Sequence, residues 1–234
     1  MAETEFKGFP EGTLRFLRDL AKNNNKTWFD AHRESYERDY VEPARAFVTA
    51  MGARLKKLAP NLNADPRVNG SLFRINRDTR FSKDKTPYKT NLAVFFWEGD
   101  GNRMECPGFY FHLEAKSLIL GTGIYLFPDT MLDRYRKAVV DPKLGAALRK
   151  AAKAVGPAFG STGCGMPIQA YKKVPAGYDA DHPNAELLKL KGLHAGTETP
   201  VPKELHSEAL LDHCQARYKE LAPIHRWLVS MLGL

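Results

Sequence analysis

The stretch LFRINRDTRFSKDKTPY, residues 72–88, begins like a β-strand and continues into a strongly charged loop. Together with Lys89 it contains six basic and two acidic side chains, so its net charge is +4, half of the chain's formal +8. The basic residues are Arg74, Arg77, Arg80, Lys83, Lys85 and Lys89, and the acidic residues are Asp78 and Asp84. Apolar residues recur at helical spacing before this stretch and at strand spacing after it, which predicts a change from helices to a sheet here.

The part of the chain before this stretch has the pattern of three helices. A stripe of leucine and phenylalanine follows Pro10, a residue type favoured in a first helical turn, and ends at the polar residues 22–25. Thr27 resembles the N-cap of a second helix, in which large ring side chains recur every four residues. These are Trp28, His32, Tyr36 and Tyr40. Pro43 either begins a third helix or kinks a longer one, because it lacks an amide donor.

Strand-like runs follow, and helices close the chain. The runs cover residues 72–78, 91–97, 108–114 and 117–127. Only two residues separate the last two runs, too few for a parallel crossover, so these strands are expected to pair antiparallel. The later elements are helices from residues 128 and 141, a mobile glycine-rich loop at 156–167, a short strand at 168–174, a helix at 184–191, a linker at 192–201 and a long helix from Pro202. We therefore predict a single α+β domain over residues 1–234, with a mostly antiparallel central sheet flanked by N- and C-terminal helices.

Composition restricts the class of protein. Hydrophobic residues make up 43% of the chain and charged residues 26%, ordinary values for a globular protein that argue against a disordered or fibrous one. The N-terminal segment is acidic where a secretory signal would be basic, and no stretch is long and apolar enough to span a membrane. Cys106, Cys164 and Cys214 lack paired metal-ligand spacing and suit a reducing compartment. These features predict a cytoplasmic protein without a membrane partner.

The sequence RINRDTRFSKDKTPYKT resembles the hallmark of a bacterial and fungal family called domain of unknown function 2461. That hallmark is an Arg-x-x-Arg-Asp-x-Arg-Phe stretch followed by an acid, a lysine and a tyrosine. Its positions here are Arg74, Arg77, Asp78, Arg80, Phe81, Asp84, Lys85 and Tyr88. The similarity covers nearly the whole chain, including FKGF at residues 6–9, PGFYFHLE at 107–114 and GYDADHP at 177–183. The resemblance implies that the motif positions matter, and it brings no activity, substrate, cofactor or catalytic residue with it.

The basic loop is the strongest candidate for a binding site. Arginine side chains present planar donor groups that suit phosphate or carboxylate oxygens, lysines add charge, and a tyrosine can donate a hydrogen bond or stack on a base. The expected ligand-binding residues are Arg74, Arg77, Asp78, Arg80, Lys85, Tyr88 and Tyr110. We expect Arg77 and Arg80 to hold oxygens and Asp78 to orient an arginine. The alternative is a structural network in which the acids pair with the cations, although two acids cannot neutralise six bases.

Strand alternation indicates a second group of polar residues. Arg74 and Asp78 share one face of the first strand, and Tyr110, His112 and Glu114 share one face of the third. If both rows lie on the same face of the sheet, they form a charged floor in which His112 or Glu114 can act as a general acid or base. The alternative, which we prefer for His112, is a solvated sheet face with cross-strand ion pairs.

No metal site or cofactor is predicted. The Gly-Thr-Gly sequence at 121–123 lacks the third glycine and the following helix of a dinucleotide site. Asp179, Asp181 and His182 place three potential metal ligands within four residues, a spacing that we interpret as a turn. Cys164, between two glycines, is interpreted as an ordinary loop thiol.

These observations lead to one functional prediction and two alternatives. We predict that the protein binds an anionic small molecule, above all one that bears phosphate, through the basic loop. The first alternative is an enzyme that uses His112 or Glu114 as an acid or base on that ligand. The second is a nucleic-acid-binding protein, whose affinity would fall steeply with salt.

Overall fold

A computed structural model describes residues 5–161 and 168–234, which fall into two compact units. The first unit comprises Met1–Phe96, Tyr110–Leu118 and Thr199–Gln215. The second comprises Trp97–Phe109, Ile119–Glu198 and Ala216–Leu234. The single domain over residues 1–234 therefore stays a prediction.

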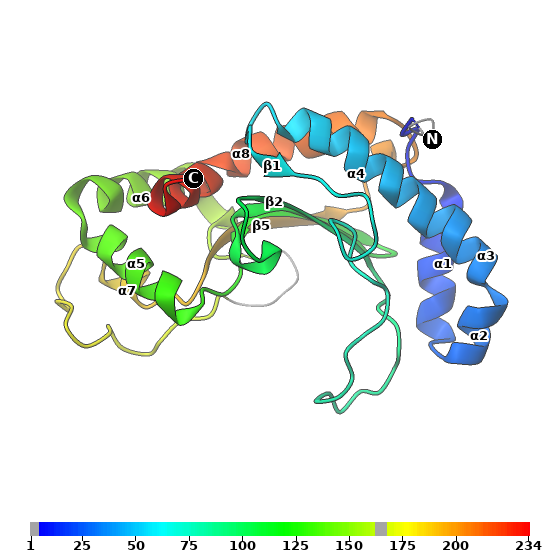
Figure 1. Ribbon diagram of the computed structural model, residues 1–234, viewed down its shortest axis with the longest axis horizontal. Helices are drawn as coiled ribbons and strands as arrows, with labels where there is room; N and C mark the ends of the chain where they lie inside the picture. Colours follow the sequence, from blue (N-terminus) through cyan, green and yellow to red (C-terminus); the bar gives the residue numbers. More distant parts are fainter. Residues whose placement is uncertain (1–4, 162–167) are drawn as a thin grey trace. The chain divides into compact units, whose positions relative to one another are not determined.

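The strands of the described residues form a five-stranded sheet in the order β1-β2-β3-β4-β5. Figure 1 labels β1, β2 and β5 of this sheet. Their bounds are Leu62–Asn63 for β1, Leu92–Glu98 for β2, Gly108–Leu113 for β3, Ser117–Ile124 for β4 and Leu193–Pro200 for β5. The amide of Glu114 donates to the carbonyl of Ser117, which closes the tight turn between β3 and β4. The predicted fold class, an α+β protein with an antiparallel sheet and helices toward both ends of the chain, is confirmed.

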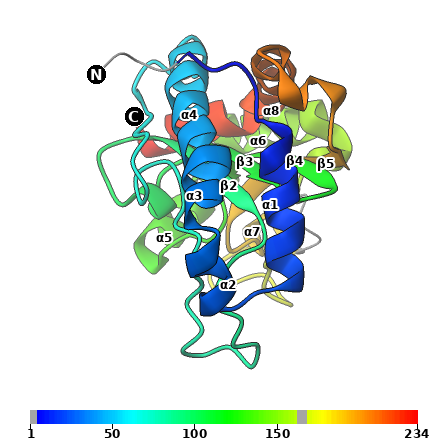
Figure 2. The same ribbon diagram turned by 90° about the vertical axis from the view of Figure 1, so that its right-hand side faces the viewer.

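Helices fill the N-terminal part of the first unit. They are α1 (Glu11–Lys22), α2 (Lys26–Ala31), α3 (Arg33–Tyr36), the π-helix η1 (Glu37–Val41) and α4 (Glu42–Leu55), and Figure 2 shows α1 alongside α3. The stripe predicted after Pro10 forms the buried face of α1. The predicted cap Thr27 lies inside α2, because the side chain of Asn25 accepts the hydrogen bond from the Trp28 amide at 3.0 Å. Pro43 lies in the first turn of α4, but α3, η1 and α4 follow one another without a break and Val41 and Glu42 keep helical backbone angles, so Pro43 stands within a longer helical stretch.

Aromatic rings form much of the core of the first unit. Phe9 stacks on Phe111 of β3 with ring centroids 5.8 Å apart, and Phe47 of α4 lies 4.6 Å from the same ring. Gly8 brings Phe9 to this position with a φ of +103°, and a β-carbon there would lie 2.3 Å from the backbone of His206. Only glycine combines that conformation with so close a backbone approach.

The second unit has its own apolar core. It is built from α5 (Asp129–Val140), α6 (Pro142–Val155), α7 (Ala185–Leu188), parts of β4 and β5, and the later part of α8 (Ala209–Leu232). Two of its buried rings have their polar atoms satisfied by carbonyl oxygens, since the hydroxyl of Tyr135 donates to Leu187 and the indole of Trp227 donates to Leu144, each at 2.8 Å. Pro223 lies within α8 without ending it. Three 3-10 turns complete the elements of the described residues, at Arg103–Glu105 (η2), Gly156–Ala158 (η3) and Lys203–His206 (η4).

The predicted linker at 192–201 is wrong, because this segment is strand β5, paired with β4. Its glycines suggested a flexible connection. A β-carbon on Gly192 would lie 2.0 Å from the carbonyl oxygen of Tyr125, so this glycine permits close pairing of two backbones. Residues 193–196 of β5 are buried, as expected for a strand that packs in the sheet.

Other boundaries moved as well. The predicted strand at 168–174 is reduced to a bridge between Ala170 and Leu190, and the one at 72–78 to bridges at Leu72 and Asn76. The loop predicted at 156–167 begins with η3, and its residues 162–167, including Cys164, lie outside the described residues. Over the described parts of the chain, no helix is both long and apolar enough to cross a membrane.

Candidate functional site

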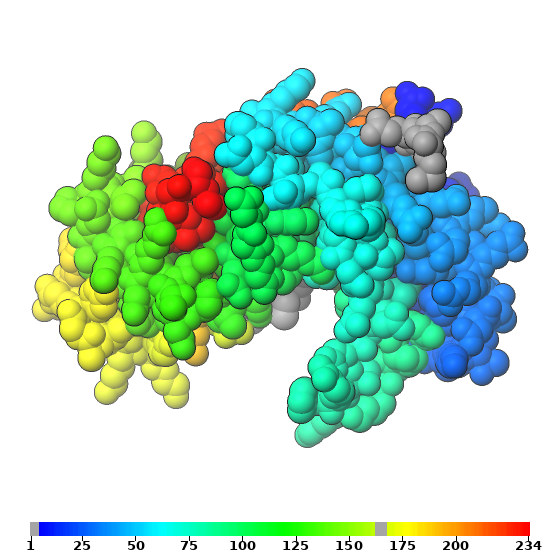
Figure 3. Space-filling model, in the orientation of Figure 1, coloured from blue at the N-terminus to red at the C-terminus, as the bar shows by residue number. Residues whose placement is uncertain are grey.

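Residues 72–89 form an irregular hairpin, here called the basic hairpin. Its arms are joined by hydrogen bonds from the Arg77 amide to the Pro87 carbonyl at 2.9 Å and from the Lys89 amide to the Ile75 carbonyl at 2.8 Å. Figure 3 shows the blue-green hairpin standing out from the surface, and most of its side chains between residues 78 and 86 are exposed. The predicted charged loop is therefore an open arm of the first unit.

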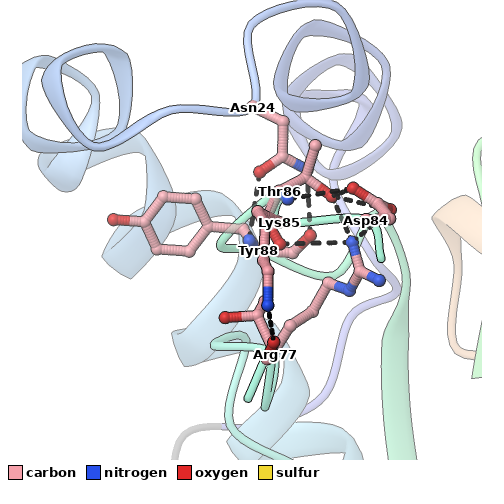
Figure 4. A network of polar contacts seen from close by, with 7 residues as sticks. Asn24, Arg77, Asp84, Lys85, Thr86 and Tyr88 are labelled. Carbon is pink, nitrogen blue, oxygen red and sulfur yellow. Dashed lines mark hydrogen bonds and ion pairs between the residues drawn. The ribbon is translucent and has the colours of Figure 1, made fainter. Parts of the chain in front are cut away.

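Asn24, at the end of α1, anchors the second arm of the basic hairpin (Figure 4). Its amide nitrogen donates to the carbonyl of Tyr88 at 2.9 Å, and its oxygen accepts from the amide of Tyr88 at 3.0 Å. The ring of Tyr88 is buried and stacks on Phe29 with centroids 4.2 Å apart. Tyr88, a predicted ligand-binding residue, therefore fixes the hairpin to the helices.

Two ion pairs hold the hairpin internally. Arg77 contacts Asp84 at 2.5 Å and also donates to the hydroxyl of Thr86. Arg80 makes a two-pronged contact with Asp78, with N–O distances of 3.0 and 2.7 Å. Lys85 donates across the hairpin to the carbonyl of Thr79 at 2.9 Å. Figure 4 shows the contacts among Arg77, Asp84 and Thr86.

These pairs leave most of the positive charge uncompensated. Each of the two aspartates binds one arginine, so the net charge of +4 over residues 72–89 remains. The side chain of Arg80 is still 77% exposed, whereas that of Arg77 is 26% exposed. Arg74, Lys83 and Lys85 are exposed too. An anion that approaches the arm therefore meets an excess of cations in a hairpin of fixed shape.

The aspartates of the hairpin should remain ionised at pH values well below 3.8, the ordinary pKa of an aspartate. Hydrogen bonds from Arg80 lower the pKa of Asp78 to about 2, and hydrogen bonds from the Thr86 amide and then from Arg77 lower the pKa of Asp84 to about 2. Folding lowers both pKa values below 3.8, the ordinary value for aspartate. The contacts therefore contribute their full stabilisation at a pH above 3.8, and this stabilisation is lost as the pH falls through about 2.

Carboxyl-carbon NMR of the folded protein measures these two titrations directly. We expect midpoints near 2 for both residues. In Arg80→Gln, the midpoint for Asp78 should rise while that for Asp84 stays in place. Midpoints near 3.8 in the wild-type protein would show that the pairs do not persist in solution.

Asn24→Ala should loosen the hairpin. The substitution removes both side-chain contacts with the partly buried backbone of Tyr88, so we expect a loss of about 1–2 kcal/mol in the free energy of unfolding. Trypsin should then cleave faster after the hairpin's arginines and lysines. Asn23→Ala is the matched control, since Asn23 makes an exposed contact with Asp19, and a change within about 0.5 kcal/mol is expected. Equal effects of the two substitutions would contradict the anchoring role of Asn24.

Tyr110, His112 and Glu114 form a hydrogen-bonded row along β3 and just beyond it. The hydroxyl of Tyr110 lies 2.9 Å from Nδ1 of His112, and Nε2 of His112 lies 3.1 Å from a carboxylate oxygen of Glu114. The side-chain nitrogen of Asn91 is 3.2 Å from the same Nδ1. Because a carboxylate only accepts hydrogen bonds, Nε2 is the donor of a neutral His112, and its Nδ1 accepts from Tyr110 and Asn91.

This row and the arginines do not converge into one floor. The ring of Phe73 makes an edge contact with Tyr110, with centroids 6.3 Å apart, so the row lies on the side of the hairpin that Phe73 faces. By strand alternation, Arg74 and Asp78 belong to the opposite side of the hairpin, and both are exposed. The alternation within each strand was predicted correctly, but the shared face was wrong. His112 is nevertheless buried, so it does not lie on a solvated sheet face.

Several residues of the site were not predicted from the sequence. Asn24 belonged to a polar break, and its 64-residue separation from Tyr88 gave no signal. Asn91 was read as the start of a strand. Phe81 had a visible signal, a large apolar side chain in a charged loop, and its side chain is 96% exposed.

The acidic turn shows no metal site. Asp179 accepts a hydrogen bond from the Asp181 amide at 2.9 Å, a local turn contact. Within residues 5–161 and 168–234, no group of three or more histidine, cysteine or acidic side chains has the arrangement of a metal site.

Fold and site together define a class of α+β protein in which an antiparallel sheet carries a basic hairpin stabilised by two arginine–aspartate pairs. The chain belongs to the family described as "Conserved hypothetical protein (DUF2461)", whose model matches residues 12–227. The resemblance found in the motif is thereby confirmed, and the match includes the whole basic hairpin. No curated protein gives a significant match.

Proposed function

We propose that the protein binds a phosphate-bearing ligand through the exposed cations of the basic hairpin. The observation that carries the proposal is the charge balance of this arm, in which two aspartates engage two arginines and a net charge of +4 remains, with the cations Arg74, Lys83 and Lys85 exposed. Guanidinium and ammonium groups suit phosphate oxygens, and a hairpin of fixed shape lowers the entropy that is lost on binding.

The open shape of the hairpin favours an extended ligand with several phosphates. An isolated anion on an exposed arm would be strongly hydrated and would gain little from each contact. A chain of phosphates contacts several cations at once and releases counterions as it binds. The cations available on the exposed arm are Arg74, Arg80, Lys83 and Lys85.

Binding of labelled inorganic polyphosphate over a salt series tests the proposal. We expect the logarithm of the affinity to fall with the logarithm of the salt concentration with a slope of roughly −3, as when about four cations displace counterions. Lys172→Ala with Lys173→Ala is the control, because it removes two exposed lysines from the second unit and should leave the slope unchanged. A folded protein that binds no polyphosphate at low salt would refute the proposal.

The row of Tyr110, His112 and Glu114 supports a second candidate function, acid–base chemistry at a site separate from the exposed cations of the hairpin. His112 is buried, and its ring is fixed at both nitrogens, with Glu114 orienting Nε2. A neutral imidazole held in this way can take the proton of Tyr110 at Nδ1 while Glu114 stabilises the resulting imidazolium. The Tyr110 phenolate can then attack the phosphorus of a phosphate ester, and the ester's P–O bond breaks to release the alcohol or phenol as its anion.

Hydrolysis of p-nitrophenyl phosphate tests this second candidate. The wild-type protein should release p-nitrophenolate, and Glu114→Gln, which removes the charge and keeps the shape, should lower the rate by about 10²-fold or more. Tyr40→Phe is the control, because the Tyr40 hydroxyl contacts the backbone of Asn91 rather than the row itself. Equal rates in the wild-type protein and Glu114→Gln would contradict it.

A further inference from the structure

The tip of the basic hairpin carries an exposed phenyl ring. The side chain of Phe81 is 96% exposed, and among the exposed large apolar side chains of the described residues it is the one that belongs to the hairpin. A ring in water forgoes the favourable transfer that burial provides, and its whole face is open to a partner.

Internal contacts of the hairpin hold this ring outward. The carboxylate of Asp78 accepts hydrogen bonds from the amide of Arg80 at 3.2 Å and from its guanidinium, and the Ser82 amide donates to the carbonyl of Thr79 at 3.3 Å. Lys85 closes the tip from the other arm through its contact with Thr79. The turn is therefore set by polar contacts on both sides of Phe81, and these leave the ring free at the apex.

One cation lies beside the ring, and a second follows closely along the chain. The guanidinium of Arg80 lies 5.8 Å from the centroid of the Phe81 ring, and its side chain is 77% exposed. Lys83, two residues further along the chain, is exposed. An aromatic surface beside exposed positive charge is the combination with which proteins bind single-stranded nucleic acids, since the ring stacks on a base and the cations contact the phosphates on either side.

We propose that the ligand of the basic hairpin is a single-stranded nucleic acid, and that Phe81 stacks on one of its unpaired bases. This inference rests on the proposed function, because the same cations hold the phosphates. A duplex presents its phosphates but keeps its base faces stacked, so a single protruding ring gains more from an unpaired strand. A membrane surface fits less well, because insertion requires a larger apolar face than one ring provides.

The effect of Phe81→Ala on two matched ligands tests the stacking. For a labelled oligothymidylate, the substitution should weaken binding about tenfold, the range expected for the loss of one stacked base. For an abasic oligonucleotide of the same length and for polyphosphate, the affinity should change less than about twofold, because the cations are intact. The stability of the fold should not change, since the ring is exposed.

A spectroscopic variant gives a second readout. In Phe81→Trp, emission above the background of the three native tryptophans should be quenched by oligothymidylate and not by the abasic strand. Equal weakening of both ligands by Phe81→Ala would overturn the proposal, as would tighter binding to duplex DNA. Binding to anionic phospholipid vesicles that depends on Phe81, without binding to oligothymidylate, would assign the ring to a membrane instead. A different result, a folded wild-type protein that binds no polyphosphate at low salt, would refute the proposed function itself.

Discussion

Replacing Arg74 and Lys83 together by glutamate is expected to weaken polyphosphate binding by about 100-fold or more, the largest effect on binding that we foresee. Each replacement changes the charge by two, so the net charge of residues 72–89 falls from +4 to zero. Both side chains are exposed, and the pairs of Arg77 with Asp84 and of Arg80 with Asp78 are untouched. The hairpin should therefore keep its shape and lose its excess of cations.

A second double variant separates local from overall charge. Lys172→Glu with Lys173→Glu changes the charge of the whole chain by the same amount and leaves the hairpin at +4. We expect it to alter the affinity by only a fewfold, through the long-range field that salt screens. Fluorescence anisotropy at low salt measures the affinity of both variants for polyphosphate. For the hairpin variant, the slope of log affinity against log salt should become shallower by about 2. Similar losses in the two variants would mean that binding follows net charge and not the hairpin.

Glu98→Ala is expected to destabilise the protein by about 3–5 kcal/mol, the largest effect on folding that we foresee. A carboxylate oxygen of Glu98 in β2 lies 2.7 Å from Nε2 of His225 in α8, and the two side chains are 4% and 2% exposed. The ring of Phe109 lies 4.5 Å from that of His225. Nδ1 of His225 is buried and has no hydrogen-bond partner among the described residues. Removal of Glu98 takes away the partner of Nε2 as well, so both nitrogens of a buried imidazole are left without a hydrogen bond.

Two controls distinguish the pair from its position. Glu98→Leu combined with His225→Leu removes both polar groups and should recover most of the stability, since a well-packed apolar pair often replaces a buried ion pair without loss. Glu105→Ala removes an exposed acid from the same unit and should change the free energy of unfolding by about 0.5 kcal/mol or less. Denaturant unfolding at neutral pH gives all three values. A loss below about 1 kcal/mol for Glu98→Ala would show that the contact with His225 is unimportant.

Local sequence patterns were sufficient for much of the fold. The stripe of α1, strands β2, β3 and β4 and the tight turn after Glu114 were predicted close to their observed places, because each depends on side chains a few residues apart. The strand β5 was missed for the opposite reason. Its glycines and prolines are typical of a linker, and its pairing depends on β4, more than 60 residues earlier in the chain.

The site shows the same division. Strand alternation correctly placed Tyr110, His112 and Glu114 in one row, but it could not reveal which face of the hairpin meets that row. A change of one residue in register exchanges the two faces, and register is set by contacts between strands. The Phe73 ring, and not the Arg74 side chain, therefore lies against Tyr110.

By itself, the sequence determined the α+β class, the family and the excess of positive charge in residues 72–89, because composition, periodicity and a short motif are local properties of the chain. The tertiary structure alone decided that Asn24 anchors the hairpin, that Phe81 stands at its exposed tip and that Glu98 meets His225, 127 residues away. Such contacts join residues that are distant along the chain, and only the packing of the folded protein selects them from the many pairings that the same residue types allow.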